Sequence, residues 1–129
     1  MTSTGTAAWI ALIGFGILAG LPAAAAESRC GWYLNPTPGN LLLIDRDGRW
    51  WMTSQMQANG PDAEGADEKA PNFDARQFVK TQPNGYGYGC ACLTVETDRE
   101  ANRITKVLGG SIRPLAQCRA DRSLPKPAM

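Results

Sequence analysis

The chain contains no histidine among its 129 residues. Histidine is the commonest general base and the commonest metal ligand in proteins, so its absence excludes Ser-His-Asp, Cys-His and His-metal chemistry. Pairs of Asp or Glu side chains remain, and two carboxyl groups can hydrolyse a glycosidic bond. These residues lie mostly in turns or in one loop, where nothing would raise the pKa of one carboxyl above that of its partner. We therefore predict no catalytic residue, no cofactor and no metal site.

The chain also lacks an excess of charge of either sign. Its 13 basic and 12 acidic side chains leave a formal net charge of +1, which is too weak a field to attract nucleic acid or an anionic membrane surface. Nucleic acid is therefore not an expected partner. A length of 129 residues corresponds to one domain, since domains commonly have about 100 to 150 residues.

Residues 1–26 contain no Asp, Glu, Lys or Arg. Within them, an apolar segment at residues 7–21 is followed by a proline and, at positions 24–26, by three alanines. This is the pattern of a signal peptide with small residues at its cleavage site. The apolar segment is shorter than the roughly 20 residues that span a bilayer. We expect cleavage after Ala26, no stable membrane insertion afterwards, and a periplasmic or secreted domain of residues 27–129.

All four cysteines lie in this expected domain, and they are Cys30, Cys90, Cys92 and Cys118. An even number in an exported domain predicts two disulfides, each stabilising the fold by about 2 to 4 kcal/mol. Residues two apart in a strand share a face, with Cα atoms roughly 6.5 to 7 Å apart, at or beyond the limit for a disulfide. A redox bridge between Cys90 and Cys92 is therefore the less favoured alternative. Both should bridge outward, to Cys30 and Cys118, in an order that the sequence leaves open.

The sequence after residue 26 favours a mainly β fold, because strand-forming segments alternate with turns rich in glycine, proline or asparagine. The expected strands are residues 30–34, 41–44, 49–53, 77–81, 86–96 and 103–108, with turns at 35–40, 45–48, 82–85 and 109–111. Residues 54–76 should form a mobile acidic loop, and residues 112–118 an edge segment before a loose tail at 119–129. We expect a small antiparallel meander or a partly open barrel.

Residues 85–91 alternate between small and large side chains. In a strand, one nearly bare face would carry Gly85, Gly87, Gly89 and Ala91, and the other Tyr86, Tyr88, Cys90 and Cys92. We expect a tryptophan of the same domain to cover the bare face. Alternatively, this strip and the aromatic side chains around it form a stacking groove for a peptide or glycan. The candidate binding residues are Trp32, Trp50, Trp51, Tyr86 and Tyr88.

Five short motifs are similar to those of one family. They are Cys-Gly-Trp-Tyr at 30–33, Asn-Pro-Thr-Pro at 35–38, Asp-Arg-Asp-Gly at 45–48, Tyr-Gly-Tyr-Gly-Cys-Ala-Cys at 86–92 and Cys-Arg-Ala-Asp at 118–121. Together they resemble the bacterial domain-of-unknown-function family numbered 4087, over nearly the whole chain after residue 26. The resemblance implies a small exported domain and brings no activity, ligand or catalytic residue with it.

These observations favour a non-catalytic binding or inhibitor module of the cell envelope. Its partner would be an envelope protein or a glycan. The alternative from another functional class is a carboxylate-dependent hydrolase that acts on cell-wall glycan. Turnover of a glycan substrate would distinguish the hydrolase from the binding module.

The first prediction concerns export. The intact mass of the protein recovered from a periplasmic extract should correspond to a chain that begins at Glu27, because the alanines before it suit signal peptidase. Mass spectrometry of the extract checks this directly. Recovery of a full-length chain from the membrane fraction would contradict it.

Overall fold

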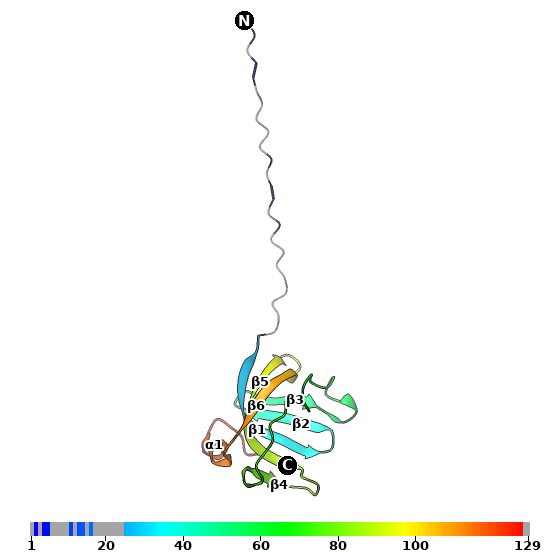
Figure 1. The fold of residues 1–129 in the computed structure, drawn as a ribbon, viewed down its shortest axis with the longest axis vertical. Coiled ribbons are helices and arrows are strands. Elements are labelled where there is room, and N and C mark those ends of the chain that lie inside the picture. Colours follow the sequence, from blue (N-terminus) through cyan, green and yellow to red (C-terminus); the bar gives the residue numbers. More distant parts are fainter. Residues whose placement is uncertain are drawn as a thin grey trace.

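The structure, a computed structural model, describes residues 25–127 continuously, together with positions 2, 4, 5, 11, 13, 14 and 16. The expected signal peptide at 1–26 therefore lies largely outside the described residues. The described domain consists mainly of strands (Figure 1). None of its helices is both long and apolar enough to cross a membrane.

Six strands and three short helical segments make up the domain. The strands are β1 (Glu27–Thr37), β2 (Asn40–Asp45), β3 (Gly48–Thr53), β4 (Phe78–Lys80), β5 (Gly87–Asp98) and β6 (Arg103–Arg113). The helical segments are η1 (Gln55–Gln57), η2 (Ala75–Gln77) and α1 (Leu115–Ala120). The turns expected at 45–48 and 82–85 each connect an antiparallel pair of strands, since β2 pairs with β3 and β4 pairs with β5.

The sheet curves into a ring. Its strand order is β1-β2-β3-β6-β5-β4, and β1 also pairs with β5. The β3–β6 contact is parallel and brief, with Trp51 opposite Arg103, whereas the other five pairings between these strands are antiparallel. The fold class is confirmed as mainly β with two disulfides, in the form of a partly open barrel. Five of the strands, β1, β2, β3, β6 and β5, close the ring in that order, and β4 is added at the edge of β5.

Strand β6 is longer than expected. Residues 109–111, predicted to form a turn, continue the strand and pair with β5, where Gly110 lies opposite Leu93. A Cβ atom on Gly110 would lie 2.6 Å from the Leu93 side chain. The glycine therefore permits close packing of two strands, which the sequence alone did not distinguish from a turn.

The end of the chain also differs from expectation. Residues 115–120 form the helix α1 where an edge segment was predicted, because Leu, Ala, Gln and Arg are good helix formers and Pro114 precedes them. The expected loose tail at 119–129 is partly attached to the barrel. The indole Nε1 of Trp32 donates to the carbonyl of Pro125 at 3.1 Å, and Leu124 packs on the outer apolar cluster.

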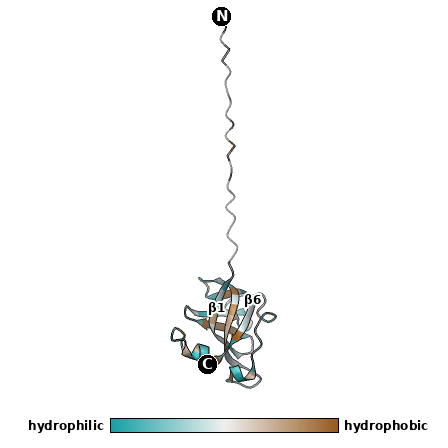
Figure 2. Cartoon of the chain, turned by 60° about the vertical axis from the view of Figure 1, so that its left-hand side comes forward, coloured by the Kyte–Doolittle hydropathy of each residue, from teal (hydrophilic) through white to brown (hydrophobic). Residues whose placement is uncertain are grey.

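Strand alternation divides the apolar side chains between the two sides of the barrel wall. The interior cluster contains Tyr33, Leu43, Trp50, Met52, Ala63, Ala66, Ala91, Leu93, Val95, Ile104 and Val107. A second cluster, the outer apolar cluster, contains Trp32, Leu34, Leu42, Ile44, Cys90, Leu115 and Cys118. Figure 2 shows apolar colouring along the strands and polar colouring in the connecting segments. The domain therefore has two cores, one inside the ring and one beneath α1.

The segment 54–76, expected to be a mobile acidic surface loop, contributes to the interior. Ala63 and Ala66 are buried among the barrel side chains. The amide of Ala63 donates to the carbonyl of Met52 at 2.7 Å, and Glu64 exchanges backbone hydrogen bonds with Thr105 and Val107. The acidic side chains misled the prediction, because they face solvent while the small alanines between them face inward.

The bare face of β5 is covered by Phe73 and by β4. A Cβ atom on Gly89 would lie 2.3 Å from the Phe73 ring, and one on Gly87 would lie 1.9 Å from the backbone carbonyl of Val79. The ring over Gly89 thus belongs to Phe73, from the segment 54–76. We had expected a tryptophan to cover this face. Phe73 also lies next to Tyr33, with ring centroids 5.3 Å apart.

The second prediction tests this contact. Gly89→Ala should destabilise the fold by about 1 to 3 kcal/mol, because overpacking forces the ring to move. In a Phe73→Ala background the same substitution should cost much less, and urea unfolding of the wild type and the three variants gives the coupling free energy. Additive effects would show that the two residues do not contact each other.

Candidate functional site

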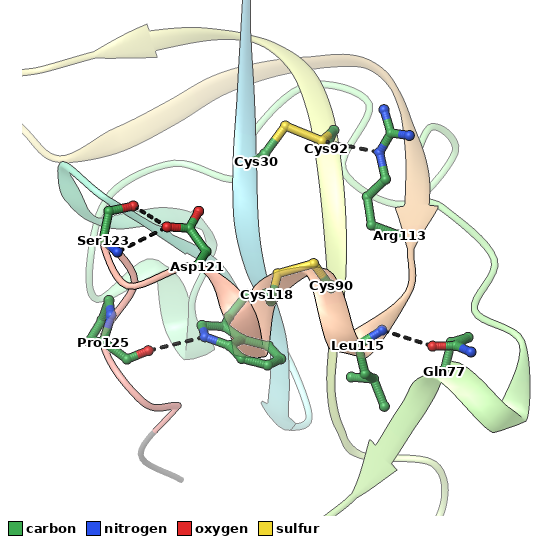
Figure 3. The surroundings of a disulfide bond; sticks show 11 residues. Cys30, Gln77, Cys90, Cys92, Arg113, Leu115, Cys118, Asp121, Ser123 and Pro125 are labelled. Carbon is green, nitrogen blue, oxygen red and sulfur yellow. Dashed lines mark hydrogen bonds between the residues drawn. A yellow bond between two sulfur atoms is a disulfide. The ribbon is translucent and has the colours of Figure 1, made fainter.

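The two disulfides are Cys30–Cys92 and Cys90–Cys118. Cys90 and Cys92 therefore each bridge outward, and the structure supplies the order that the sequence left open. Figure 3 shows one bridge between β1 and β5 and the other between β5 and α1. Cys30 lies directly opposite Cys92 in the antiparallel ladder.

The five aromatic candidates do not form one groove. Trp50 is 4% exposed and lies inside the barrel, whereas Trp32 is 3% exposed and belongs to the outer apolar cluster. Trp51 and Tyr88 pack partly buried against that outer cluster, where Trp32 and Tyr88 meet edge to face at 5.4 Å. Tyr86 lies half-buried just before β5. Since Phe73 and β4 cover the bare strip, the stacking groove predicted from the sequence is not open.

The most concentrated polar site is an ionic cluster around Arg29 at one end of the barrel. The Arg29 side chain is 5% exposed, and its guanidinium carbon lies 3.9 Å from the centre of the Trp50 ring. It donates to Asp45 at 2.7 Å, to Asp47 at 3.1 Å and to Glu27 at 3.1 Å. A buried arginine needs such partners, because an uncompensated buried charge is strongly destabilising.

Asp45 connects the cluster to the interior. Its Oδ1 accepts hydrogen bonds from the indole of Trp50 at 2.9 Å and from the backbone amide of Asp47 at 2.8 Å. Its Oδ2 accepts the bond from Arg29. The predicted 45–48 turn therefore also supplies the counter-charges for a buried cation. Sequence reasoning missed this role, although strand alternation places Arg29 on the inward face with Tyr33.

The cluster opens on a cavity of about 350 Å³ that is lined in part by Arg46, Arg99 and Asp121. A hydrogen bond from Thr97, together with the Arg29 and Arg99 guanidinium groups, holds the pKa of Glu27 below its ordinary value. A general acid needs a carboxyl whose pKa is raised. Glu27 is therefore suited to holding Arg29 and is a poor proton donor.

A second notable surface is the segment Ser54–Gln57 (the Met56 loop), which directly follows β3. Met56 is fully exposed, whereas other large apolar side chains of the described domain are mostly buried. Both Met56 and Gln57 have left-handed backbone angles, with φ of 54° and 55°. No motif in the sequence marked this position, since a single methionine between polar residues has no periodic pattern.

The third prediction concerns the ionic cluster. Arg29→Met should lower the free energy of unfolding by about 3 to 5 kcal/mol, because Asp45 keeps a buried charge without its cation. Combining it with Asp45→Asn should restore part of the loss, since an asparagine oxygen can still accept from Trp50. Urea unfolding measures both variants, and a single variant as stable as the wild type would contradict the prediction.

Comparison with known proteins places these features in a family. No curated protein and no solved structure matches the chain. A family model described as "Protein of unknown function (DUF4087)" matches residues 24–125, which include the whole barrel, both disulfides and the Arg29 cluster. The chain belongs to the DUF4087 family of proteins of unknown function.

Proposed function

We propose that the protein is a non-catalytic, exported binding module that docks on an envelope protein through the Met56 loop. The observation that carries this proposal is Met56 itself, a fully exposed apolar side chain on a left-handed backbone. A non-glycine residue in this conformation costs about 1 to 3 kcal/mol, and such strain concentrates at ligand-binding positions. In the isolated domain the exposed Met56 side chain makes no apolar contact that would offset this cost.

The loop is held in a fixed shape by the neighbouring β1–β2 turn. The side-chain Nε2 of Gln55 donates to the backbone carbonyl of Pro38 at 2.9 Å. The backbone amide of Gln55 donates to Oδ1 of Asn40, also at 2.9 Å. The hydroxyl of Thr53 donates to the carbonyl of Gly39, also at 2.9 Å. A loop already ordered in the free protein loses less conformational entropy on binding, which favours affinity.

Hydrogen bonds between Ser54 and residues that follow Met56 also hold the loop. The hydroxyl of Ser54, which is buried, accepts from the amide of Asn59 at 2.9 Å. The carbonyl of Ser54 accepts from the amide of Gln57 at 2.9 Å. The exposed methionine therefore projects from a turn whose backbone is fixed on both sides. This arrangement suits an anchor residue that enters a preformed apolar pocket.

The surroundings of Met56 favour a partner with basic groups around an apolar pocket. Met56, Asp62 and Asp67 border a shallow depression of about 580 Å³. Methionine is enriched at protein interfaces, where its flexible thioether adapts to the partner. Carboxylates at the rim steer association toward complementary positive charge. A protein with such a pocket, for example a secreted hydrolase that the module inhibits, fits this chemistry.

The fourth prediction tests the loop. In calorimetric titrations against a panel of purified periplasmic and secreted hydrolases, the protein should bind at least one member saturably. Met56→Asp should weaken that binding by about 30-fold or more, as expected for an interface hot spot. Met56→Leu should retain most of it, because the anchor stays apolar.

The matched control is Leu108→Asp, which places the same charge at an exposed apolar position of β6. It should leave the affinity unchanged, and all three variants should keep the unfolding midpoint of the wild type. Binding that survives Met56→Asp, or no saturable binding across the panel, would refute the proposal. Turnover of peptidoglycan fragments in a parallel assay would instead support the alternative, a carboxylate-dependent hydrolase acting on cell-wall glycan.

A further inference from the structure

The two disulfides differ sharply in their environments. In the bridge between β5 and α1, Cys90 is 1% exposed and Cys118 is 4% exposed, and both belong to the outer apolar cluster. In the other bridge, Cys30 is exposed and Cys92 is half-buried. A thiol reagent can therefore reach Cys30 in the folded protein, whereas the Cys90–Cys118 bridge requires local opening first.

The exposed bridge also joins strands that are already held together. Antiparallel pairing of β1 with β5 runs from Glu27 opposite Val95 to Asn35 opposite Gly87, and Cys30 opposite Cys92 lies within it. Breaking this disulfide leaves the ladder on both sides intact. The buried bridge has no such support, since α1 is attached to β5 chiefly through Cys118 and its apolar neighbours.

A cation lies beside one sulfur of the exposed bridge. The Nε of Arg113 donates to the Sγ of Cys92 at 3.4 Å, as Figure 3 shows. Within the described part of the chain, Arg113 makes no ion pair with a carboxylate. Its charge is therefore available to a thiolate that forms on Cys92, and positive neighbours stabilise thiolates.

From these three observations we propose that Cys30–Cys92 is a thiol–disulfide exchange site that accepts two electrons from an external dithiol. The thiolate of the dithiol attacks Sγ of Cys30, the Cys30–Cys92 bond breaks, and Cys92 leaves as a thiolate beside Arg113. The second thiol of the dithiol then attacks the mixed disulfide and releases Cys30. The dithiol is oxidised to a disulfide, and its two protons pass to Cys30 and to Cys92 or solvent.

This site is separate from the Met56 loop and does not depend on the proposed function. The proposal gives the two disulfides different roles. Cys90–Cys118 stabilises the fold, and Cys30–Cys92 reacts. Attack at Cys30 is the favoured direction for two reasons. Cys30 is the more exposed sulfur-bearing residue, and a better-stabilised thiolate on Cys92 is the better leaving group.

The fifth prediction is tested with dithiothreitol as the dithiol and the oxidised full chain. Timed samples are alkylated, and mass spectrometry of proteolytic peptides gives the reduction rate of each bridge. The exposed bridge should be reduced at least about tenfold faster than the buried one, since only the latter requires opening. Circular dichroism after this first step should still show the folded domain. Equal rates, or faster reduction of Cys90–Cys118, would overturn the proposal.

Variants of Arg113 separate reactivity from simple exposure. Arg113→Ala should slow reduction of Cys30–Cys92 by roughly three- to tenfold, whereas Arg113→Lys should retain most of the rate. Arg76→Ala is the matched control, because it also removes one exposed arginine and Arg76 pairs with Asp74. In a Cys30→Ser background, the pH midpoint of Cys92 thiolate formation should rise with Arg113→Ala. An unchanged rate and midpoint in the Arg113→Ala variants would refute the role of Arg113.

Discussion

The pairing of β1 with two neighbours is the constraint on which the structure depends. β1 is hydrogen-bonded to β2 on one side and to β5 on the other, so it closes a sheet that would otherwise be open. Once the ring is closed, every side chain of β1 lies either inside or outside the barrel. Tyr33 and Arg29 face inward, and Trp32 and Cys30 face outward. The ionic cluster, the aromatic packing and the exposed disulfide all follow from which side chains of β1 face the interior and which face outward.

The inward position of Arg29 has further consequences for the sequence around it. A guanidinium at the end of an apolar barrel requires nearby anions, which are supplied by Asp45 at the end of β2 and by Asp47 in the turn that follows. The same turn connects β2 to β3. Its acidic residues therefore do two things at once, since they reverse the chain and neutralise a buried charge. A turn made only of glycine and asparagine would reverse the chain equally well and leave Arg29 without partners.

Local sequence signals predicted the strands well and their arrangement less well. Both hairpins could be predicted because glycine-rich or aspartate-rich turns interrupt short runs of strand formers. The β1–β5 pairing that closes the ring joins residues 62 apart at the Cys30–Cys92 bridge, and no local pattern records such a contact. The cysteine spacing was the one local signal related to this contact. Because Cys90 and Cys92 should not bridge to each other, it predicted that one of them bonds to Cys30.

The candidate site was harder to predict than the fold. Aromatic side chains were taken as binding residues, yet Trp32 and Trp50 are the large buried side chains of the two cores. Composition cannot separate an aromatic residue that packs inside a domain from one that contacts a ligand. Met56 and Arg113 were missed for the opposite reason. The roles proposed for them depend on neighbours in space, which are the β1–β2 turn that holds Gln55 next to Met56, and Cys92 beside Arg113.

The barrel topology does not by itself assign a ligand, because one fold supports many functions. In OB-folds, oligonucleotides and oligosaccharides commonly bind on the face of the second and third strands and on adjacent loops. Here Leu42 of β2 and Trp51 of β3 belong to or pack on the outer apolar cluster, together with Leu115 and Leu124 from the end of the chain. That face is therefore used for the domain's own second core. The proposed docking site therefore lies on a loop, because the loop that carries Met56 combines a backbone held by hydrogen bonds with an exposed apolar side chain.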